Sequence, residues 1–572
     1  MDVLTDSPRD CAAGTSVRAE PPLVRHFRQV LLWPLRVTPG HTDSAQPIKH
    51  WELLETLGES CPWREVMDEF GDAANFSERH YKEFITFLPY VQRFLYGENT
   101  AGDGQPGYGR SPIRVLRRHD VGQMRVMLEE SSPALVFDIA HVDLYFFFDI
   151  DIIILAVEFF TDDLPLLLAE DVLFKVGRAY PAFWEKNGQG GQCPYRVEWL
   201  SPSGATLAAS DYEDREKYLQ FTCQHRSPNV SAHWEFLLLP LALHHSDRQG
   251  TIRFRQIEYH RMPLMAYLSF DDPRDLTRGD FARLALVTKG GPSDTLPYSA
   301  KHLTGFENDY CYDKFWDAQN PALTSRYLCC GQAFVVVGKA SQPFFANAET
   351  GLLGQFRHQY FIVNLIAHFQ KAALMLFSEW LVVAVSQLNA YDTESIREFK
   401  REIRRIMATF LRFTERYWFH EVSDQAQIRD LFRLLTGHLN TDRIYLDVST
   451  SVKDTNHYLD SDSQRRQANT VTRLTVVTTF GLIATVATGF LGMNIFSEAD
   501  NPGWVKLAIF AAVVTPCALL VNYAVAHSKV LSDFMEALAD RTLTWSDRMR
   551  ILLRIWSAPS DKRLKSRPAV KQ

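Results

Sequence analysis

The stretch LTVVTTFGLIATVATGFLGMNIF, Leu474 to Phe496, decides how the C-terminal part of the chain folds. It contains 23 residues and no charged side chain, and a second uncharged run of 20 residues follows from Leu507 to Ala526. At about 1.5 Å per residue, a helix of either length crosses a hydrocarbon core of about 30 Å. The short connection predicts a membrane-spanning helical hairpin, in which Pro516 is a candidate kink.

A third apolar run, Val142 to Phe160, is not expected to cross a membrane. It carries four acidic residues, and each aspartate in mid-helix costs about 2.5 to 3.5 kcal/mol on the insertion scale. Its β-branched and aromatic residues instead predict two buried strands that turn around Asp149 to Asp151.

The composition predicts a large soluble part beside the two short spans. The chain has 572 residues, a formal net charge of -7 and 23% charged residues, which suggests no nucleic-acid partner and more than one folding unit. Its eight cysteines form no CxxC pair, which favours a reducing compartment without disulfides or a zinc site. The N-terminus lacks a signal-peptide pattern, and we expect disorder over residues 1–22.

Basic residues near the ends of the spans predict their orientation. Three arginines precede the first span and four basic residues follow the second, whereas the connecting loop carries Glu498 and Asp500. Both termini are therefore expected in the cytoplasm, with the protein in the cell (inner) membrane as a multi-pass protein.

The remaining sequence predicts an α/β cytoplasmic domain followed by a long stalk helix. Strand-like runs at 26–37, 234–243 and 331–338 place the α/β domain at residues 23–354, and helical patterns place the stalk region at 355–470. The later segments are a pore-lining span at 471–496, an external loop at 497–506, a second span at 507–527, and a basic tail with an amphipathic helix at 528–572.

Helical periodicity gives the stalk region its expected packing faces. The segment 396–419 predicts an amphipathic helix that buries Phe399, Ile403, Ile406, Phe410 and Phe413. A second helix is expected to begin near Asp424 and to continue without a break into the first span, with Gly437 as its weak point. Its packed positions are predicted to be Leu435, Leu439, Leu446, Val448, Val452 and Leu459.

Enzyme motifs do not support catalysis. Gly102, Gly104 and Gly107 match GxGxxG, but Pro106 and the lack of a following helix indicate a plain loop. His244 and His245 lack a second ligand pair at metal spacing and are expected to be surface residues. We find no nucleophile with a base and no phosphate loop, and therefore expect neither an enzyme nor an organic cofactor.

One face of the first span differs from the others. Steps of three and four residues place hydroxyl groups above bulky apolar residues on a single stripe: Val471, Leu474, Thr478, Leu482, Thr485 and Gly489. In a ring of several copies this stripe is suited to a gated ion path. Small and hydroxyl residues also occur where membrane helices pack together, so the stripe alone leaves both interpretations open.

The residues at the end of the first span resemble a motif of a known protein family. Gly492, Met493 and Asn494, at the end of the first of two closely spaced spans, resemble the Gly-Met-Asn motif of the CorA family of magnesium transporters. The preceding helix is similar to the family's pore helix in Leu474-Thr475 and in the position of Thr485. The resemblance covers about residues 465–526, and upstream of these residues it rests on architecture only.

The resemblance implies a homopentamer in the lipid bilayer that passes hydrated Mg²⁺ into the cytoplasm under the membrane potential. Five copies of Asn494, with Gly492 carbonyl groups, would contact the water shell of the ion, and Asn469 would lie near the inner entrance. Mg²⁺ is then the transported ion and also a candidate regulator at acidic stalk residues. Those available are Asp447, Asp454, Asp460 and Asp462.

Two alternatives stay open at this point. The loop lacks the MPEL sequence of many relatives, which leaves Zn²⁺, Co²⁺ or Ni²⁺ as other transported ions. The large N-terminal region also allows a membrane-anchored sensor or scaffold that does not conduct. Glu498 and Asp500 either concentrate cations at the pore mouth or are simply solvated.

Overall fold

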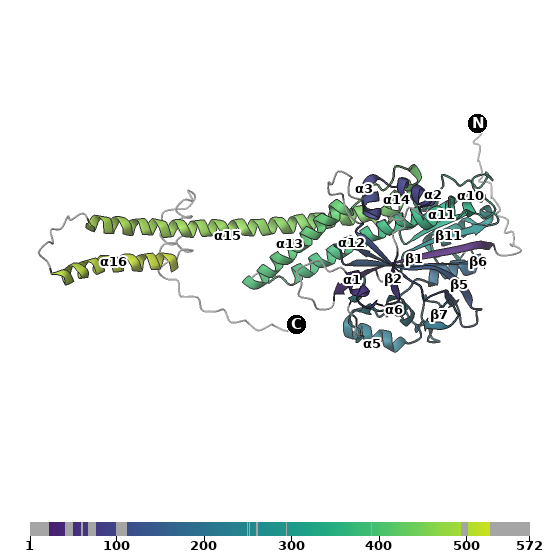
Figure 1. Cartoon of the computed structure of the whole chain (residues 1–572), viewed down its shortest axis with the longest axis horizontal. Coiled ribbons are helices and arrows are strands. Elements are labelled where there is room, and N and C mark those ends of the chain that lie inside the picture. The colour runs from purple at the N-terminus through teal and green to yellow at the C-terminus, as the bar shows by residue number, and fades with distance from the viewer. Residues whose placement is uncertain are drawn as a thin grey trace, which may run out of the picture. The chain divides into compact units, whose positions relative to one another are not determined.

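The computed structural model divides the chain into two compact units, Met1–Val452 and Lys453–Gln572 (Figure 1). The residues that the structure describes are 22–39, 50–58, 61–66, 76–98, 111–248, 250, 252–258, 261–292, 295–389, 392–492 and 502–526.

The N-terminal unit is built on one large sheet whose central strand is β1 (Leu23–Pro39), of 17 residues. The described residues form 14 strands. The main path runs β12 (Cys311–Tyr312), β13 (Arg326–Cys329), β14 (Ala333–Lys339), β11 (Leu264–Phe270), β1, β6 (Ile152–Pro165), β5 (Leu135–Phe147), β4 (Gln123–Met127), β7 (Arg196–Leu200), β8 (Thr206–Ala209). Off this path, β10 (Ile252–Gln256) pairs with β1 and with β9 (Ala242–Leu243), and β3 (Ile113–Arg118) pairs with β5 and with β2 (Trp63–Glu65).

The predicted pair of buried strands is confirmed. β5 and β6 are antiparallel, with Val142 opposite Val157 and Leu144 opposite Leu155. Asp149 in their connection has a left-handed backbone with φ of 68°, which aspartate tolerates better than most residues. The acidic residues that argued against a membrane span therefore lie in a sheet and its turn.

Helices cover both faces of this sheet. On one face, Phe27, Trp33 and Val157 belong to a hydrophobic core that is closed by α4 (Leu166–Lys175), α6 (Ala232–Leu238) and α7 (Arg278–Leu286). Shorter or peripheral helices are α1 (His50–Glu55), α2 (Glu78–Thr86), α3 (Pro89–Tyr96), α5 (Arg215–His225), α8 (Ala300–Leu303), α9 (Phe306–Tyr310), α10 (Pro343–Ala346) and α11 (Leu352–Gln355).

The other face is covered by α12 (Phe361–Ser386), which continues from α11 through a π-helical turn at Phe356–Tyr360. The Phe369 ring of α12 stacks on Phe147 of β5, with ring centres 3.8 Å apart. In the described residues, Leu352–Ser386 is the one helix long and apolar enough to cross a membrane, but 72% of its most apolar window is buried. The sheet and the neighbouring helices make it a core helix.

The predicted amphipathic helix is α13 (Thr393–Arg416), and its predicted buried face is confirmed. Ile403, Ile406 and Phe413 are fully buried, and Phe399 and Phe410 are 6% and 7% exposed. α13 packs on α12, where the Phe377 and Phe410 rings lie 5.3 Å apart. α14 (Ala426–Leu439) packs against α12 as well, so the unit has three layers, α/β/α.

The single long helix predicted from Asp424 is interrupted. α14 ends at Leu439, and the next residue, Asn440, has a φ of 58° in the left-handed region. A new helix, α15 (Thr441–Gly492), begins directly after it. The break lies at Asn440 rather than at Gly437, because asparagine also adopts this conformation at helix ends. Beyond it, α15 is continuous for 52 residues.

Two further expectations are wrong. The run 234–243 is not a strand but α6, followed by a turn and the two residues of β9. Its buried residues follow helical spacing: Trp234, Leu237, Leu238 and Leu241. This spacing is hard to recognise in the sequence because most residues of the run are apolar. Leu446, predicted to be packed, is 62% exposed, because it lies outside the buried stripe of α15 that contains Val448 and Val452.

The second unit contains the rest of α15 and α16 (Gly503–Ala526), which has Pro516 in its interior. The predicted N-terminal disorder, the GxGxxG loop and the tail helix lie outside the described residues, as does the loop after Gly492.

The packing of α13 on α12 can be tested by comparing a buried position with an exposed one. Ile403→Ala removes a fully buried side chain and should lower the free energy of unfolding by about 2 to 5 kcal/mol. Leu411→Ala on the same helix, at a side chain that is 62% exposed, should change it by less than about 0.5 kcal/mol. Urea denaturation of the full chain in detergent measures both. Equal effects would contradict the burial pattern.

One buried carboxyl group links stability to pH. Glu170 of α4 is 2% exposed, and its carboxyl oxygens have no well-formed hydrogen bond within the described part of the chain, although the Gly291 backbone and Arg283 lie near enough to favour the charged form. Burial, and then the nearby charge of Asp280, raise its pKa to about 8. The folded protein therefore keeps a proton at neutral pH that the unfolded chain releases.

Because the folded-state pKa of Glu170 is raised, the free energy of unfolding should fall as pH rises from about 4.5 to about 8. The slope due to this group is at most about 1.4 kcal/mol per pH unit. Glu170→Gln should remove that part of the slope, whereas Glu130→Gln, at an exposed position, should leave it unchanged. Thermal midpoints of the full chain between pH 5.5 and 8 provide the measurement, and identical slopes for wild type and Glu170→Gln would overturn the assignment.

Candidate functional site

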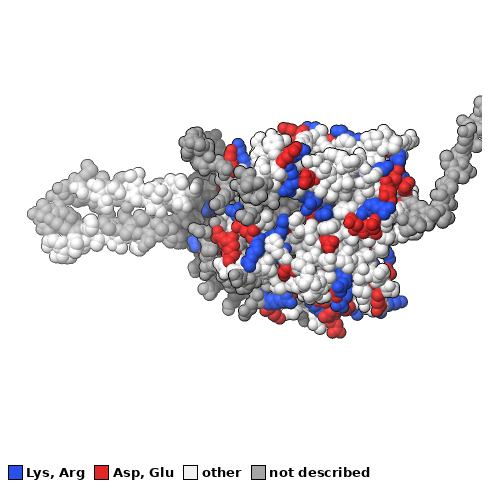
Figure 2. All heavy atoms as spheres, turned by 45° about the vertical axis from the view of Figure 1, so that its right-hand side comes forward, with Lys and Arg blue, Asp and Glu red and all other residues white. Residues whose placement is uncertain are grey.

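The predicted stripe occupies one face of α15. Steps of three and four residues on a helix of 3.6 residues per turn keep its six positions within an arc of about 80°. All six are exposed within the chain, with Val471, Leu474 and Leu482 at 62%, 63% and 66%. In Figure 2 the described atoms at the C-terminal end of α15 and at the N-terminal end of α16 are white, whereas charged residues are interspersed over the N-terminal unit.

The hydroxyl groups on this stripe are oriented by the helix itself. Thr478 Oγ1 donates to the Leu474 carbonyl at 2.9 Å, and Thr485 Oγ1 donates to the Gly481 carbonyl at 2.8 Å. Thr475 and Thr488, off the stripe, make similar bonds to backbone carbonyls. Because each hydroxyl group donates its proton to a backbone carbonyl, the lone pairs of its oxygen remain available on the outer side of the helix to accept hydrogen bonds.

The predicted selectivity residues lie at the edge of what the structure describes. Gly492 is the last residue of α15 and is exposed. Met493, Asn494, Glu498 and Asp500 lie outside the described residues, so their roles stay predictions.

The predicted regulatory acids lie on α15. Asp447, Asp454 and Asp460 are exposed, and Asp460 accepts a hydrogen bond of 3.4 Å from Asn456; the side chain of Asp462 is not described. Within the described ranges no group of three or more His, Cys, Asp or Glu side chains is placed to hold a metal ion.

The N-terminal unit contains a buried ionic cluster that the sequence did not suggest. Glu158 of β6 accepts from Arg28 of β1 and from Arg357, whose Nε lies 3.0 Å from the carboxylate. Burial by itself raises the pKa of Glu158, but the two guanidinium groups outweigh it and hold the pKa below its usual value. Arg357 belongs to the π-helical turn before α12, so the cluster fixes this turn to the sheet.

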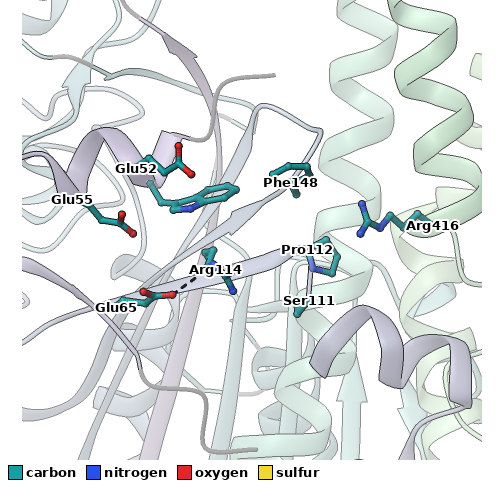
Figure 3. Close-up of a pocket in the computed structure, with 9 residues that line it drawn as sticks. Glu52, Glu55, Glu65, Ser111, Pro112, Arg114, Phe148 and Arg416 are labelled. Carbon is teal, nitrogen blue, oxygen red and sulfur yellow. Dashed lines mark ion pairs between the residues drawn. The ribbon is translucent and has the colours of Figure 1, made fainter. Parts of the chain in front are cut away.

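A cavity of about 480 Å³ lies between the sheet and the end of α13 (Figure 3). Its residues are Trp51, Glu52, Glu55, Glu65, Ser111, Pro112, Arg114, Phe148 and Arg416. Both arginines have acidic partners, because Arg114 lies 3.6 Å from Glu65 and Arg416 lies 3.1 Å from Asp149. None of the sequence-predicted site residues lines this cavity.

The two histidines predicted to lie on the surface, His244 and His245, are next to a third histidine in the structure. The His244 and His245 rings are in contact, with centres 4.2 Å apart, and His225 of α5 stacks on His245 at 5.1 Å. Burial lowers the pKa of His244 and of His245, and neighbouring positive groups lower both further. His225 is distant in sequence, so spacing gave no sign of it.

Residues 381–523 match the family described as CorA-like Mg²⁺ transporter protein. The matched segment runs from the last turns of α12 through α13, α14 and α15 into α16. It makes up about a quarter of the chain and supports membership of the CorA family, which confirms the resemblance seen in the sequence. This family indicates divalent cation transport by a membrane protein. No curated protein and no solved structure matches the chain.

Proposed function

We propose that the protein is a membrane-potential-driven channel that moves hydrated Mg²⁺ into the cytoplasm through a homopentameric pore. The observation that carries this proposal is the family match over residues 381–523, which includes the uncharged end of α15 and its exposed stripe. Residues 474–496 and 507–526 form the membrane hairpin of the proposal, with both termini in the cytoplasm.

The chemistry of the stripe suits a hydrated cation. Mg²⁺ releases its waters reluctantly, and waters bound to a cation direct their hydrogens outward. Thr478 and Thr485 already donate to the helix backbone, so in a ring of five chains their oxygens are placed to accept from that water shell. Leu474 and Leu482 on the same face supply apolar constrictions of the kind that gate by excluding water.

The entrance of the proposed pore is the Gly492-Met493-Asn494 motif. Five Asn494 amide oxygens and the nearby Gly492 carbonyl groups accept hydrogen bonds from the waters of the ion. Amides select by geometry without holding a divalent cation as tightly as carboxylates would. Glu498 and Asp500 in the loop raise the local cation concentration in this proposal.

The membrane potential supplies the driving force. Two positive charges entering a cytoplasm that is negative by 100 mV gain about 4.6 kcal/mol, so no nucleotide is required. The stalk acids Asp447, Asp454, Asp460 and Asp462 form the proposed regulatory Mg²⁺ sites, through which cytoplasmic Mg²⁺ closes the pore.

Replacing the entrance amide tests the pore. In liposomes loaded with a magnesium dye and held inside-negative, the wild type should take up Mg²⁺. Asn494→Ala should reduce this uptake by at least about tenfold, since the five copies each lose hydrogen bonds of about 1 kcal/mol. Asn501→Ala, which removes an amide seven residues later, is the matched control and should conduct like the wild type.

The same liposomes separate the alternatives. Uptake of Zn²⁺, Co²⁺ or Ni²⁺ in place of Mg²⁺ would reassign the transported ion on the same scaffold. Folded wild-type protein that takes up none of the four ions would contradict a channel and favour the membrane-anchored sensor.

The stripe makes a second prediction, about hydroxyl oxygens. Thr485→Val keeps the size of the side chain but removes the acceptor, and should lower Mg²⁺ uptake by about fivefold or more, the equivalent of about 1 kcal/mol. Thr485→Ser should retain most of the uptake. Thr488→Val, off the stripe, should have little effect, and an equal loss in both valine variants would indicate helix packing instead.

A further inference from the structure

We propose that the cavity between the sheet and the end of α13 binds a basic amino acid, of the class of free lysine or arginine. Its volume of about 480 Å³ lies within the range of about 300 to 1,000 Å³ that is usual for small-molecule sites. This inference goes beyond the proposed transport of Mg²⁺ and does not rest on it. All residues that line the cavity belong to the N-terminal unit, and none belongs to the stripe on α15.

The charges that line the cavity are unequal in number. The lining contains three glutamates and two arginines: Glu52, Glu55, Glu65, Arg114 and Arg416. Its other residues are uncharged, so the negative charges exceed the positive ones. A cleft with an excess of one sign concentrates ligands of the opposite sign. The lining therefore favours a ligand with net positive charge, which lysine and arginine carry at neutral pH.

Arg114 and Glu65 form a loose ion pair that the two charged groups of an amino acid suit. Arg114 Nε lies 3.6 Å from Glu65 Oε1 (Figure 3), which is longer than a hydrogen bond of about 2.7 to 3.2 Å. Within the described residues, the Arg114 side chain has no other ion pair or hydrogen bond. The α-carboxylate and α-ammonium groups of an amino acid are attached to one carbon atom, so both can be paired here at once. Guanidinium groups bind carboxylates with two parallel hydrogen bonds, which assigns the carboxylate to Arg114.

The apolar residues of the lining suit the stem of a basic side chain. Trp51 of α1 and Phe148, in the connection between β5 and β6, have ring centres 5.7 Å apart, and Pro112 also lines the cavity. Lysine and arginine lay their methylene stems along apolar surfaces and keep their charged ends among polar groups. A cation near the face of an indole ring is attracted by the ring as well.

The charged end of such a side chain meets the acidic residues of α1. Figure 3 shows Glu52 and Glu55 of α1 on one side of the cavity and Arg416 of α13 on the other. Both glutamates are exposed, and Glu55 has no ion pair or hydrogen bond within the described residues. Arg416 is held by Asp149 at 3.1 Å. A cationic end group therefore binds at the α1 side, away from Arg416.

The cavity connects the sheet with the family-matched segment. Arg416 is the last residue of α13 and lies within residues 381–523, whereas Arg114 belongs to β3. A ligand in the cavity touches both elements. Its binding would fix the end of α13 on the sheet, by which the N-terminal unit responds to a small molecule.

Calorimetric titration of the full chain in detergent tests the class of ligand. One L-lysine should bind per chain. Cadaverine, which lacks the carboxylate of lysine, and norleucine, which lacks its side-chain ammonium group, should each bind at least about tenfold more weakly, since each loses hydrogen bonds between charged groups. Folded wild-type protein that binds neither lysine nor arginine would overturn the proposal. Cadaverine or norleucine that binds as tightly as lysine would overturn it as well.

Two variants locate the ends of the ligand. Arg114→Gln should remove the preference for lysine over cadaverine, and Glu55→Gln should reduce the preference for lysine over norleucine. Arg397→Gln and Glu130→Gln, at exposed positions outside the lining, are the matched controls and should titrate like the wild type. The exposed position of Glu55 keeps its variant folded if Arg114→Gln is not. Equal titrations of Glu55→Gln and Glu130→Gln would contradict the site, and no outcome depends on whether the pore conducts Mg²⁺.

Discussion

The packing of α12 between the sheet and α13 is the interaction on which the N-terminal unit depends. On one side Phe369 stacks on Phe147 of the sheet, and on the other Phe377 packs on Phe410 of α13. Because α12 is apolar enough to resemble a membrane span, its burial at 72% requires both neighbours at once. α13 ends at Arg416, and the ring of the next residue, Tyr417, also packs on Phe369 of α12, with ring centres 5.5 Å apart. The family match begins at residue 381, near the C-terminal end of α12.

The ionic cluster at the start of α12 adds specificity to that packing. A buried carboxylate is costly unless it is paired, and Glu158 is paired with arginines from two different elements, Arg28 and Arg357. Arg357 reaches it from a π-helical turn, a conformation that is rare in proteins and frequent at functional positions. An apolar contact would tolerate sliding of α12 along the sheet, whereas this cluster fits one register.

The sequence predicts correctly those elements whose apolar residues recur at a clear spacing. The prediction fails where so many residues are apolar that no spacing can be recognised. The β5–β6 pair and the buried face of α13 follow from β-branched residues and from helical spacing at Phe399 to Phe413. The run 234–243 is so rich in leucine that the helical spacing of its buried residues does not stand out from the sequence, and the helix break at Asn440 depends on a backbone conformation that composition does not reveal. In the candidate site, the stripe on α15 could be predicted because its residues are close in sequence and lie on one helix. The contact of His225 with His245 and the cavity beside Arg416 could not be predicted, since only the tertiary fold brings their residues together.

The threonine hydroxyls of α15 have one further consequence, which concerns the sign of the charge that a pore can pass. Each hydroxyl on the stripe uses its proton on the helix backbone, and the other side chains of the stripe are apolar or absent. Such a wall presents oxygen lone pairs and no N–H or O–H. The waters around a chloride ion direct hydrogens at the ion and oxygens outward, and these oxygens find no donor on such a wall, whereas the waters around a cation direct hydrogens outward and find acceptors. In the proposed pore, anions are therefore rejected without any fixed negative charge in the membrane.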